Sequence, residues 1–378
     1  MAETLTPNRL RDLAGFRSES GCAVSLYLDL DPALSPTPAA VDSRVNSLLS
    51  DAEKRLAARR DELDHDERTS LRRDFGRIRR FFENDFNRDG ARGYAVFVCG
   101  DFWHEIALAY PVADRVTIGK AFHVGPLALH VGRGDGALVA FIGREKGQLF
   151  RLRAGRLVEV SDLTEDQPSR HDQGGWSQAN YQRHIEKLVG EHLRDVAAEL
   201  DRAVRRLRTP HIVVVGSEET RAEFLDALPP EVRAAIVGTT EAEAHAGPNE
   251  LLALVRPLIE EAEAEDEHQA IERWREEAGK DGRAASGWAE TLEAASDARV
   301  EVLLYAAGAN TPAHECPQCG RASLAGGECP LDGSPLEPRE SGFDLAVERT
   351  LANGGTLLAV RHQVDLGAVG GIAALLRF

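Results

Sequence analysis

The chain has 378 residues, a formal net charge of −17 and 43% hydrophobic residues. This length is too great for one ordinary core, so we expect two or three domains. The negative charge argues against a protein that coats nucleic acid non-specifically. No apolar run approaches the roughly 18 residues of a membrane helix, and the N-terminus lacks an apolar signal core. We therefore expect a cytoplasmic protein that does not enter membranes.

The first part of the chain predicts a mixed α/β domain over residues 1–135. Residues 23–30 are typical of a strand, and residues 93–99 and 102–108 predict two strands that pair. Between these strands, residues 41–82 carry apolar side chains at helical spacing in two segments, which predicts two amphipathic helices. We find no glycine-rich phosphate loop and no catalytic signature in this domain.

A second α/β domain is predicted over residues 136–281. Its expected elements are a strand at 137–142, a hairpin at 148–160, a long helix at 178–208, a strand at 211–216, a helix at 218–227, a strand at 233–237 and an acidic helix at 249–277. A hairpin followed by alternating strands and helices favours a mixed sheet with helices on its faces.

The last part of the chain predicts a small α/β domain over residues 282–378. Its expected elements are strands at 299–305, 356–360 and 372–378, and a helix at 342–352. A cysteine-rich insertion interrupts this domain between its first strand and its helix. Three of the five cysteines of the chain lie in that insertion.

The insertion contains two similar turns. One reads Cys316-Pro-Gln-Cys319-Gly, and the other reads Cys329-Pro-Leu-Asp332-Gly. In each, candidate ligands are three residues apart and a glycine follows, which is how zinc ribbons hold a tetrahedral ion. We predict a structural Zn²⁺ in a ribbon at 314–338, with Cys316, Cys319, Cys329 and Asp332 as ligands. Two alternatives stay open: His314 as the fourth ligand, and a ribbon without metal.

The second distinctive segment is residues 173–178, which read Gln-Gly-Gly-Trp-Ser-Gln. Adjacent glycines permit positive φ angles and let the backbone approach another molecule closely. The segment follows a polar stretch and precedes a long predicted helix, so we expect an exposed loop that offers a glutamine to a site outside the protein. The plain alternative is a surface loop that leads into a helix capped by Ser177.

Three features together resemble the archaeal and eukaryotic class-I peptide-chain release factors. They are this loop in the second of three domains, the ribbon in the third, and residues 370–378, which read Gly-Gly-Ile-Ala-Ala-Leu-Leu-Arg-Phe. The chain is more similar still to their bacterial relatives, in the superfamily of the Pelota-like proteins and the peptidyl-tRNA hydrolases of ribosome quality control. The resemblance implies an α/β protein of three-domain release-factor-like architecture, with an RNase H-like middle domain.

The resemblance also implies a site. In the family, a Gly-Gly-Gln loop enters the peptidyl-transferase centre and positions water to cleave the peptidyl-tRNA ester. Catalytic roles would pass to Gly174, Gly175 and Gln178, with Gln173 as the second choice for the glutamine. Such a glutamine orients water and stabilises an oxyanion rather than exchanging protons. RNA contacts would come from Trp176, Arg183 and His184.

Two departures from the family narrow the expected function. Trp176 and Ser177 separate the glycines from the glutamine, and the first domain lacks an Asn-Ile-Lys-Ser stop-codon motif. We therefore expect a monomeric peptidyl-tRNA hydrolase of ribosome rescue or quality control. Its partners would be large-subunit rRNA and peptidyl-tRNA, with a translational GTPase as a further candidate. The alternatives are a non-catalytic occupant of the A site in stress or hibernation, and a zinc-stabilised scaffold that acts away from the ribosome.

Overall fold

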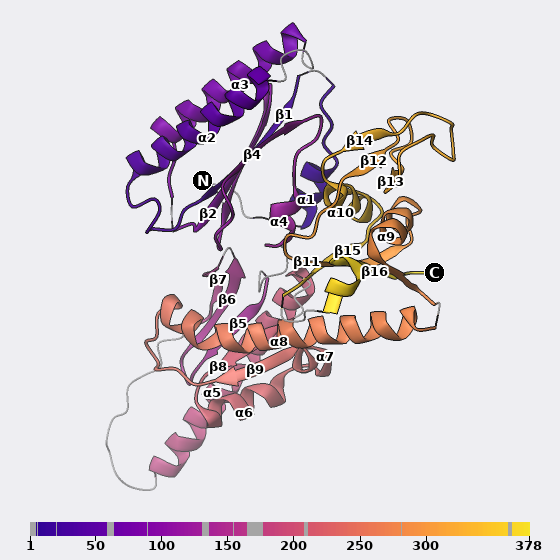
Figure 1. Cartoon of the computed structure of the whole chain (residues 1–378). Helices are drawn as coiled ribbons and strands as arrows, with labels where there is room; N and C mark the ends of the chain where they lie inside the picture. Colours follow the sequence, from indigo (N-terminus) through magenta and orange to yellow (C-terminus); the bar gives the residue numbers. More distant parts are fainter. Residues whose placement is uncertain are drawn as a thin grey trace. The chain divides into compact units, whose positions relative to one another are not determined.

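The computed structural model describes residues 5, 7–19, 21–58, 64–88, 90–130, 136–153, 155–164, 177–207, 211–280, 282–361 and 365–378, without the side chains of residues 7, 177–186 and 207. The chain forms two compact units, one made of Met1–Val131 with Glu267–Phe378 and the other of Gly132–Asp266. Both are mixed α/β, as predicted (Figure 1). Residues 1–131 and 282–378, which we assigned to two domains, share the first unit. Residues 267–281, which we assigned to the middle domain, also belong to it.

An antiparallel sheet of order β3-β2-β1-β4 forms the N-terminal part of the first unit. Its strands are β1 (Ala23–Asp29), β2 (Gly93–Cys99), β3 (Phe102–Leu108) and β4 (Arg115–Gly119). Helices α2 (Pro38–Ala58) and α3 (His65–Asn84) pack against one face, where Val24 and Leu26 meet Phe75. The opposite face, which carries Ala23 and Tyr27, contacts α1 (Pro7–Ala14) and α4 (Gly125–Ala128) in a separate core.

The C-terminal part of the first unit has a second sheet, of order β10-β16-β11-β15. Its elements are β10 (Ala284–Ser286), α9 (Gly287–Ser296), β11 (Val300–Ala306), α10 (Gly342–Ala352), β15 (Thr356–Val360), the 3₁₀ helix η2 (Asp365–Val369) and β16 (Ile372–Leu376). One hydrophobic core joins Phe122 of the N-terminal part to Tyr305 and Phe343 of this part. The Tyr305 hydroxyl donates to the Ala128 carbonyl over 2.7 Å. The first unit is therefore held together by a core that both ends of the chain supply.

A small three-stranded sheet lies between β11 and α10 in the sequence. Its strands are β12 (Ala313–Glu315), β13 (Ala322–Ser323) and β14 (Glu337–Arg339), in the order β13-β12-β14. This is the insertion that we predicted as a ribbon. Residues 316–321 and 324–336, between its strands, carry the predicted metal ligands.

The second unit is built on a five-stranded sheet of order β7-β6-β5-β8-β9. Its elements are β5 (Leu138–Ile142), β6 (Gly147–Arg153), β7 (Arg156–Asp162), α5 (Ser177–Leu207), β8 (Ile212–Val215), α6 (Glu218–Ala227), α7 (Pro230–Ala234) and β9 (Ile236–Thr240). The hairpin and the parallel β5-β8-β9 pairing fit the predicted mixed sheet. The strand predicted at 233–237 is displaced, because the Pro229-Pro230 pair starts a short helix and the strand follows it.

Helix α8 (Pro248–Ala278) contributes to both units. Its first half places Leu251 and Val255 in the core of the second unit, beside Val139 of β5. Its second half places Ile271 and Trp274 in a core of the first unit. No helix in the described part of the chain combines the length and apolar character that a membrane span requires.

Candidate functional site

The predicted glycine loop lies at the edge of what the structure describes. Gly174, Gly175 and Trp176 are outside the described residues. Helix α5 begins at Ser177, so Gln178 is its second residue. Arg183 and His184 follow within the first turns of the same helix, and their side chains are also outside the description. The roles that we assigned to these six residues therefore stay predictions.

The four predicted metal ligands lie together. One ligand atom from each of Cys316, Cys319, Cys329 and Asp332 lies within 4.8 Å of the other three. The Cys319 and Cys329 sulfurs are 3.5 Å apart, and the Cys316 sulfur is 3.3 Å from Oδ2 of Asp332. Two sulfurs bound to one tetrahedral zinc ion are separated by about 3.7 Å, given Zn–S bonds of about 2.3 Å. These two separations are close to those of a tetrahedral site, and the four side chains lie near enough to one another to bind one ion.

The two turns of the cluster have nearly the same backbone. Gly320 N–H donates to the Cys316 carbonyl over 2.8 Å, and Gly333 N–H donates to the Cys329 carbonyl over 2.9 Å. The two glycines have φ angles of 72° and 74°, in the left-handed region that glycine adopts without strain. The glycine after each ligand pair is therefore required by the turn, which explains the sequence repeat.

Backbone groups stabilise charge on two of the ligands. Burial disfavours the Cys329 thiolate, but the N–H groups of Leu331 and Asp332, together with the Cys319 and Cys316 thiols, outweigh it and lower the pKa of Cys329. The Ser334 N–H and hydroxyl lower the pKa of Asp332 to about 2. At Cys319 the N–H of Arg321 lowers the thiol pKa, but burial and the other three ligands together raise it to about 12. The ligand side chains thus affect one another's pKa values.

His314, our alternative fourth ligand, lies in β12 and is not a member of the group of four. Its Nδ1 is buried and has no hydrogen-bond partner among the described residues. Its ring lies beside Gly326, where a methyl group would be 3.0 Å from its Nε2. The geometry therefore favours Asp332 as the fourth ligand.

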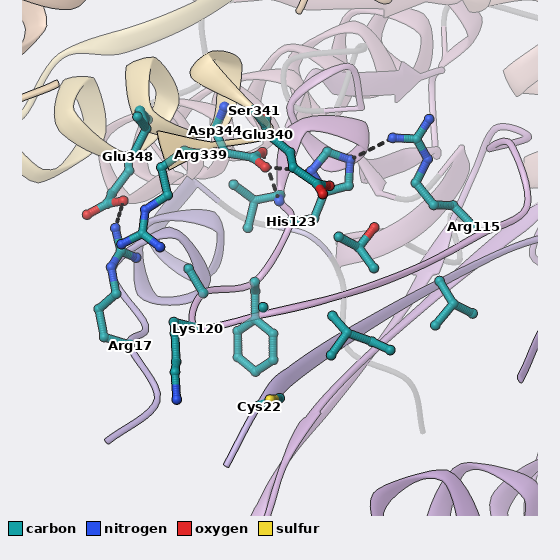
Figure 2. Close-up of a pocket in the computed structure, with 18 of the residues that line it drawn as sticks. Arg17, Cys22, Arg115, Lys120, His123, Arg339, Glu340, Ser341, Asp344 and Glu348 are labelled. Carbon is teal, nitrogen blue, oxygen red and sulfur yellow. Dashed lines mark hydrogen bonds and ion pairs between the residues drawn. The ribbon is translucent and has the colours of Figure 1, made fainter. Parts of the chain in front are cut away.

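The first unit also contains a cavity of about 710 Å³ that we did not predict (Figure 2). All of β4 lines it on one side, and residues from β14 and α10 line the other. The volume is in the range of ligand pockets, which is about 300–1,000 Å³. Its walls come from residues about two hundred positions apart, so no sequence motif marks it.

A histidine–carboxylate pair, His123 and Asp344, lies in the lining of the cavity. His123 Nδ1 lies 2.5 Å from Oδ2 of Asp344, and its Nε2 lies 3.4 Å from a guanidinium nitrogen of Arg115 (Figure 2). A hydrogen on Nδ1 satisfies both contacts, since Asp344 then accepts and Arg115 donates. The other oxygen of Asp344 accepts the Gly125 N–H over 2.8 Å, and Ser341 caps the helix that carries Asp344. The contacts of His123 and Asp344 thus join α10 to the N-terminal part.

A buried carboxylate beside the cysteine cluster binds three arginines. The Glu315 side chain is 5% exposed and lies 2.8 Å from Arg339, 3.0 Å from Arg349 and 3.2 Å from Arg17. Burial opposes its charge, but Arg17 and Arg339 outweigh that cost and lower its pKa. Glu348 also pairs with Arg17 (Figure 2). It lies 3.5 Å from Arg349 as well. Burial raises the pKa of Glu348 despite these partners.

Comparison with known proteins supports the family resemblance. Residues 123–263 match the model of bacterial archaeo-eukaryotic release factor family 10. Peptide chain release factor subunit 1 of Methanopyrus kandleri is 29% identical over 215 residues, which are 54% of this chain and 51% of the relative. The same factor of Archaeoglobus fulgidus is 25% identical over 252 residues, which are 60% of this chain and 62% of the relative. The matches thus span about half to three-fifths of these relatives.

Solved structures of the same group also match. The crystal structure of the archaeal translation termination factor aRF1 is 16% identical, with 99% of each chain covered and a TM-score of 0.27. Ribosome-bound archaeal Pelota, in a model with ABCE1, is 17% identical, with 76% of this chain and 77% of that chain covered and a TM-score of 0.46. The sequence matches confirm the similarity to the archaeal peptide chain release factors that the motifs predicted.

Proposed function

We propose that this chain is a release-factor-like translation factor that acts at the ribosome and hydrolyses the ester bond of peptidyl-tRNA in rescue or quality control. The observation that carries the proposal is the family match over residues 123–263, which contains the glycine loop and nearly all of the second unit. Large-subunit rRNA and peptidyl-tRNA would be its partners, a translational GTPase would deliver it, and the cytoplasm would be its place of action.

The position of α5 supports a role for the loop in positioning water. The helix begins at Ser177, directly after the glycine pair, and runs to Leu207. The free N–H groups and the positive dipole end of such a long helix favour negative charge at its N-terminus. Gln178, in the first turn, would orient water toward the ester carbonyl while this end of the helix stabilises the developing oxyanion. Remaining catalytic groups would come from rRNA and tRNA.

Single-turnover release of peptide from stalled ribosome complexes tests this function. We expect Gln178→Ala to slow release by about 10²–10³-fold, the usual loss for one positioned oxyanion or water ligand. Gln148→Ala is the matched control, because Gln148 lies in the same unit and its side chain bonds Glu159 and Asp162 of the neighbouring strand. Absence of release by the wild type would refute the hydrolase. Equal release by Gln178→Ala would refute the role of Gln178, and Gln173 would then be the candidate glutamine.

A second candidate function is non-catalytic occupation of the A site. It is favoured by the position of Gln178, which is separated from the second glycine by two residues and lies inside α5. Under this alternative the protein would co-sediment with idle 70S ribosomes and release no peptide. Failure to co-sediment with 70S ribosomes or 50S subunits at low salt would count against both ribosomal functions and leave the scaffold alternative.

We propose in addition that the cysteine cluster holds a structural Zn²⁺. Its four ligand atoms match a closed tetrahedral set, and such a site leaves no open position for substrate. The ion would fix the two turns of a segment that has few apolar residues of its own. We expect about one zinc per chain by metal analysis, lost in Cys316→Ser and kept in Cys99→Ser, since Cys99 lies in β2. A full zinc complement in Cys316→Ser would contradict the assignment.

A further inference from the structure

The first turn of the cysteine cluster contacts an ion network through Arg349. The guanidinium of this α10 residue lies so close to Gly320 that a methyl group there would be 1.9 Å from its Nη2. The same guanidinium binds Glu315, which directly precedes the ligand Cys316. The positions of Glu315 and Arg349 therefore depend on the conformation of the turn.

Arg17 connects this network to the N-terminal sheet. It binds Glu315 and Glu348, and its guanidinium also donates to the carbonyl of Ala14. The neighbouring Phe16 ring stacks on Phe122 with ring centres 4.4 Å apart. On the other side, Ser18 N–H donates to the carbonyl that follows β4, at residue 120. Arg17 is thus fixed to the N-terminal part by its own segment, and its charged end reaches the C-terminal part.

We propose that metal occupancy of the cysteine cluster controls how firmly residues 13–19 and the adjoining end of β4 are docked on the C-terminal part of the first unit, with Glu315 and Arg17 as the coupling residues. A buried carboxylate is stable only while its cationic partners are in place. When the first turn loses its metal, Arg349 and Glu315 lose the geometry that the turn imposes on them. Arg17 then loses a partner, and the docking of its segment weakens.

Other contacts limit the change to this region. The shared hydrophobic core, the His123–Asp344 pair and the bond from Tyr305 to Ala128 do not pass through the cluster. Metal loss should therefore loosen the side of the cavity that Arg17 and Glu348 line and leave the two parts joined (Figure 2). The inference rests on the zinc proposed above and is independent of any activity at the ribosome.

Hydrogen exchange of the full chain, with zinc and after chelation, tests the proposal. We expect chelation to speed exchange at residues 13–19 and 117–124 by about tenfold or more, the factor that corresponds to about 1.4 kcal/mol. Strands β5 and β8 of the second unit serve as internal controls and should exchange at unchanged rates. Metal analysis of the same samples separates failure of the proposal from failure to bind zinc. Unchanged exchange at 13–19 in a sample shown to have lost its zinc would overturn the proposal.

Two arginine variants decide whether the ion network carries the coupling. In Arg17→Met we expect fast exchange at 13–19 even at full zinc content, and no further response to chelation. Arg11→Met is the matched control, because Arg11 also joins the two parts, through the Leu351 carbonyl, without contacting the cluster network. It should keep the response to chelation. If chelation unfolds the whole first unit, hydrogen exchange of the zinc-loaded Arg17→Met variant still tests the proposal. Exchange at residues 13–19 as slow as in the wild type would then refute the coupling.

Discussion

The glycines that close the two cysteine turns differ in their surroundings. Both have positive φ angles, so alanine at either costs about 1–2 kcal/mol of strain. A methyl group at Gly333 would meet nothing within 4 Å, whereas one at Gly320 would displace the Arg349 guanidinium from its carboxylates. We therefore expect Gly320→Ala to lower the free energy of unfolding by about 1.5–3 kcal/mol more than Gly333→Ala does. Urea unfolding of the zinc-loaded proteins measures both, and equal losses would show that Arg349 moves freely.

Asp74 on α3 is a buried carboxylate with an incomplete set of partners. It accepts the Gly100 N–H over 3.1 Å, and its other oxygen has no hydrogen bond among the described residues. Burial raises the pKa of Asp74. The Gly100 N–H, the charges of Arg73 and Arg77, and the Ser70 side chain only partly offset this rise. Because the folded state binds this proton more tightly than the unfolded state, ionised Asp74 costs stability above its folded pKa. Below about pH 4, where aspartate is protonated in both states, the cost disappears.

Two substitutions at Asp74 separate its charge from its hydrogen bond. Asn keeps an acceptor for Gly100 and removes the charge, so we expect Asp74→Asn to stabilise the protein at pH 7 and to lose that advantage as the pH falls toward 4. Asp74→Ala leaves the Gly100 N–H without its partner and should cost about 1–3 kcal/mol. Thermal unfolding between pH 4 and pH 7 gives both results. A pH-independent effect of Asp74→Asn would show that the carboxylate is not desolvated.

At the scale of elements, the second half of helix α8 stabilises the first unit through Trp274. Trp274 is buried in the first unit and donates its indole N–H to the Ala285 carbonyl. We expect Trp274→Ala to lower the stability of the first unit by about 3–5 kcal/mol, from lost burial and a cavity. Leu254 lies on the same helix and is 40% exposed, so Leu254→Ala should have little effect. Hydrogen exchange of β11 and β16 measures the loss, and unchanged exchange there would place Trp274 outside that core.

The same helix shows which features of the fold could not be predicted from the sequence. Local patterns located most elements within a few residues: the helix expected at 342–352 is α10, and the strands expected at 93–99 and 102–108 are β2 and β3. The helix expected at 249–277 is α8, but its apolar residues do not say which core each half enters. The four side chains that the cysteine spacing singled out lie together, and their role as metal ligands stays a prediction. The sequence did not predict that Glu315 binds three arginines, because one glutamate and three arginines that are distant in the sequence form no motif.

At the scale of the whole molecule, the shared core explains why two predicted domains form one unit. Strand β1 has apolar side chains on both faces, Val24 and Leu26 toward α2 and α3, and Ala23 and Tyr27 toward the opposite side. A strand that is apolar on both faces requires cover on both. The sequence between α1 and α4 supplies little of that second cover, and Leu292, Tyr305 and Phe343 complete it. The N-terminal sheet and the C-terminal part therefore depend on each other.

Separate fragments test this dependence. We expect residues 132–266 to unfold cooperatively alone, because both faces of their sheet are covered by helices within the fragment. Fragments 1–131 and 267–378 should each bind a hydrophobic dye and lack a cooperative transition, since each exposes half of the shared core. Mixed together, they should form a one-to-one complex that unfolds cooperatively. Tyr305→Phe, which removes the bond to Ala128, should weaken that complex by about 1 kcal/mol, or about fivefold in Kd. Cooperative folding of 1–131 by itself would show instead that its sheet needs cover on one face only.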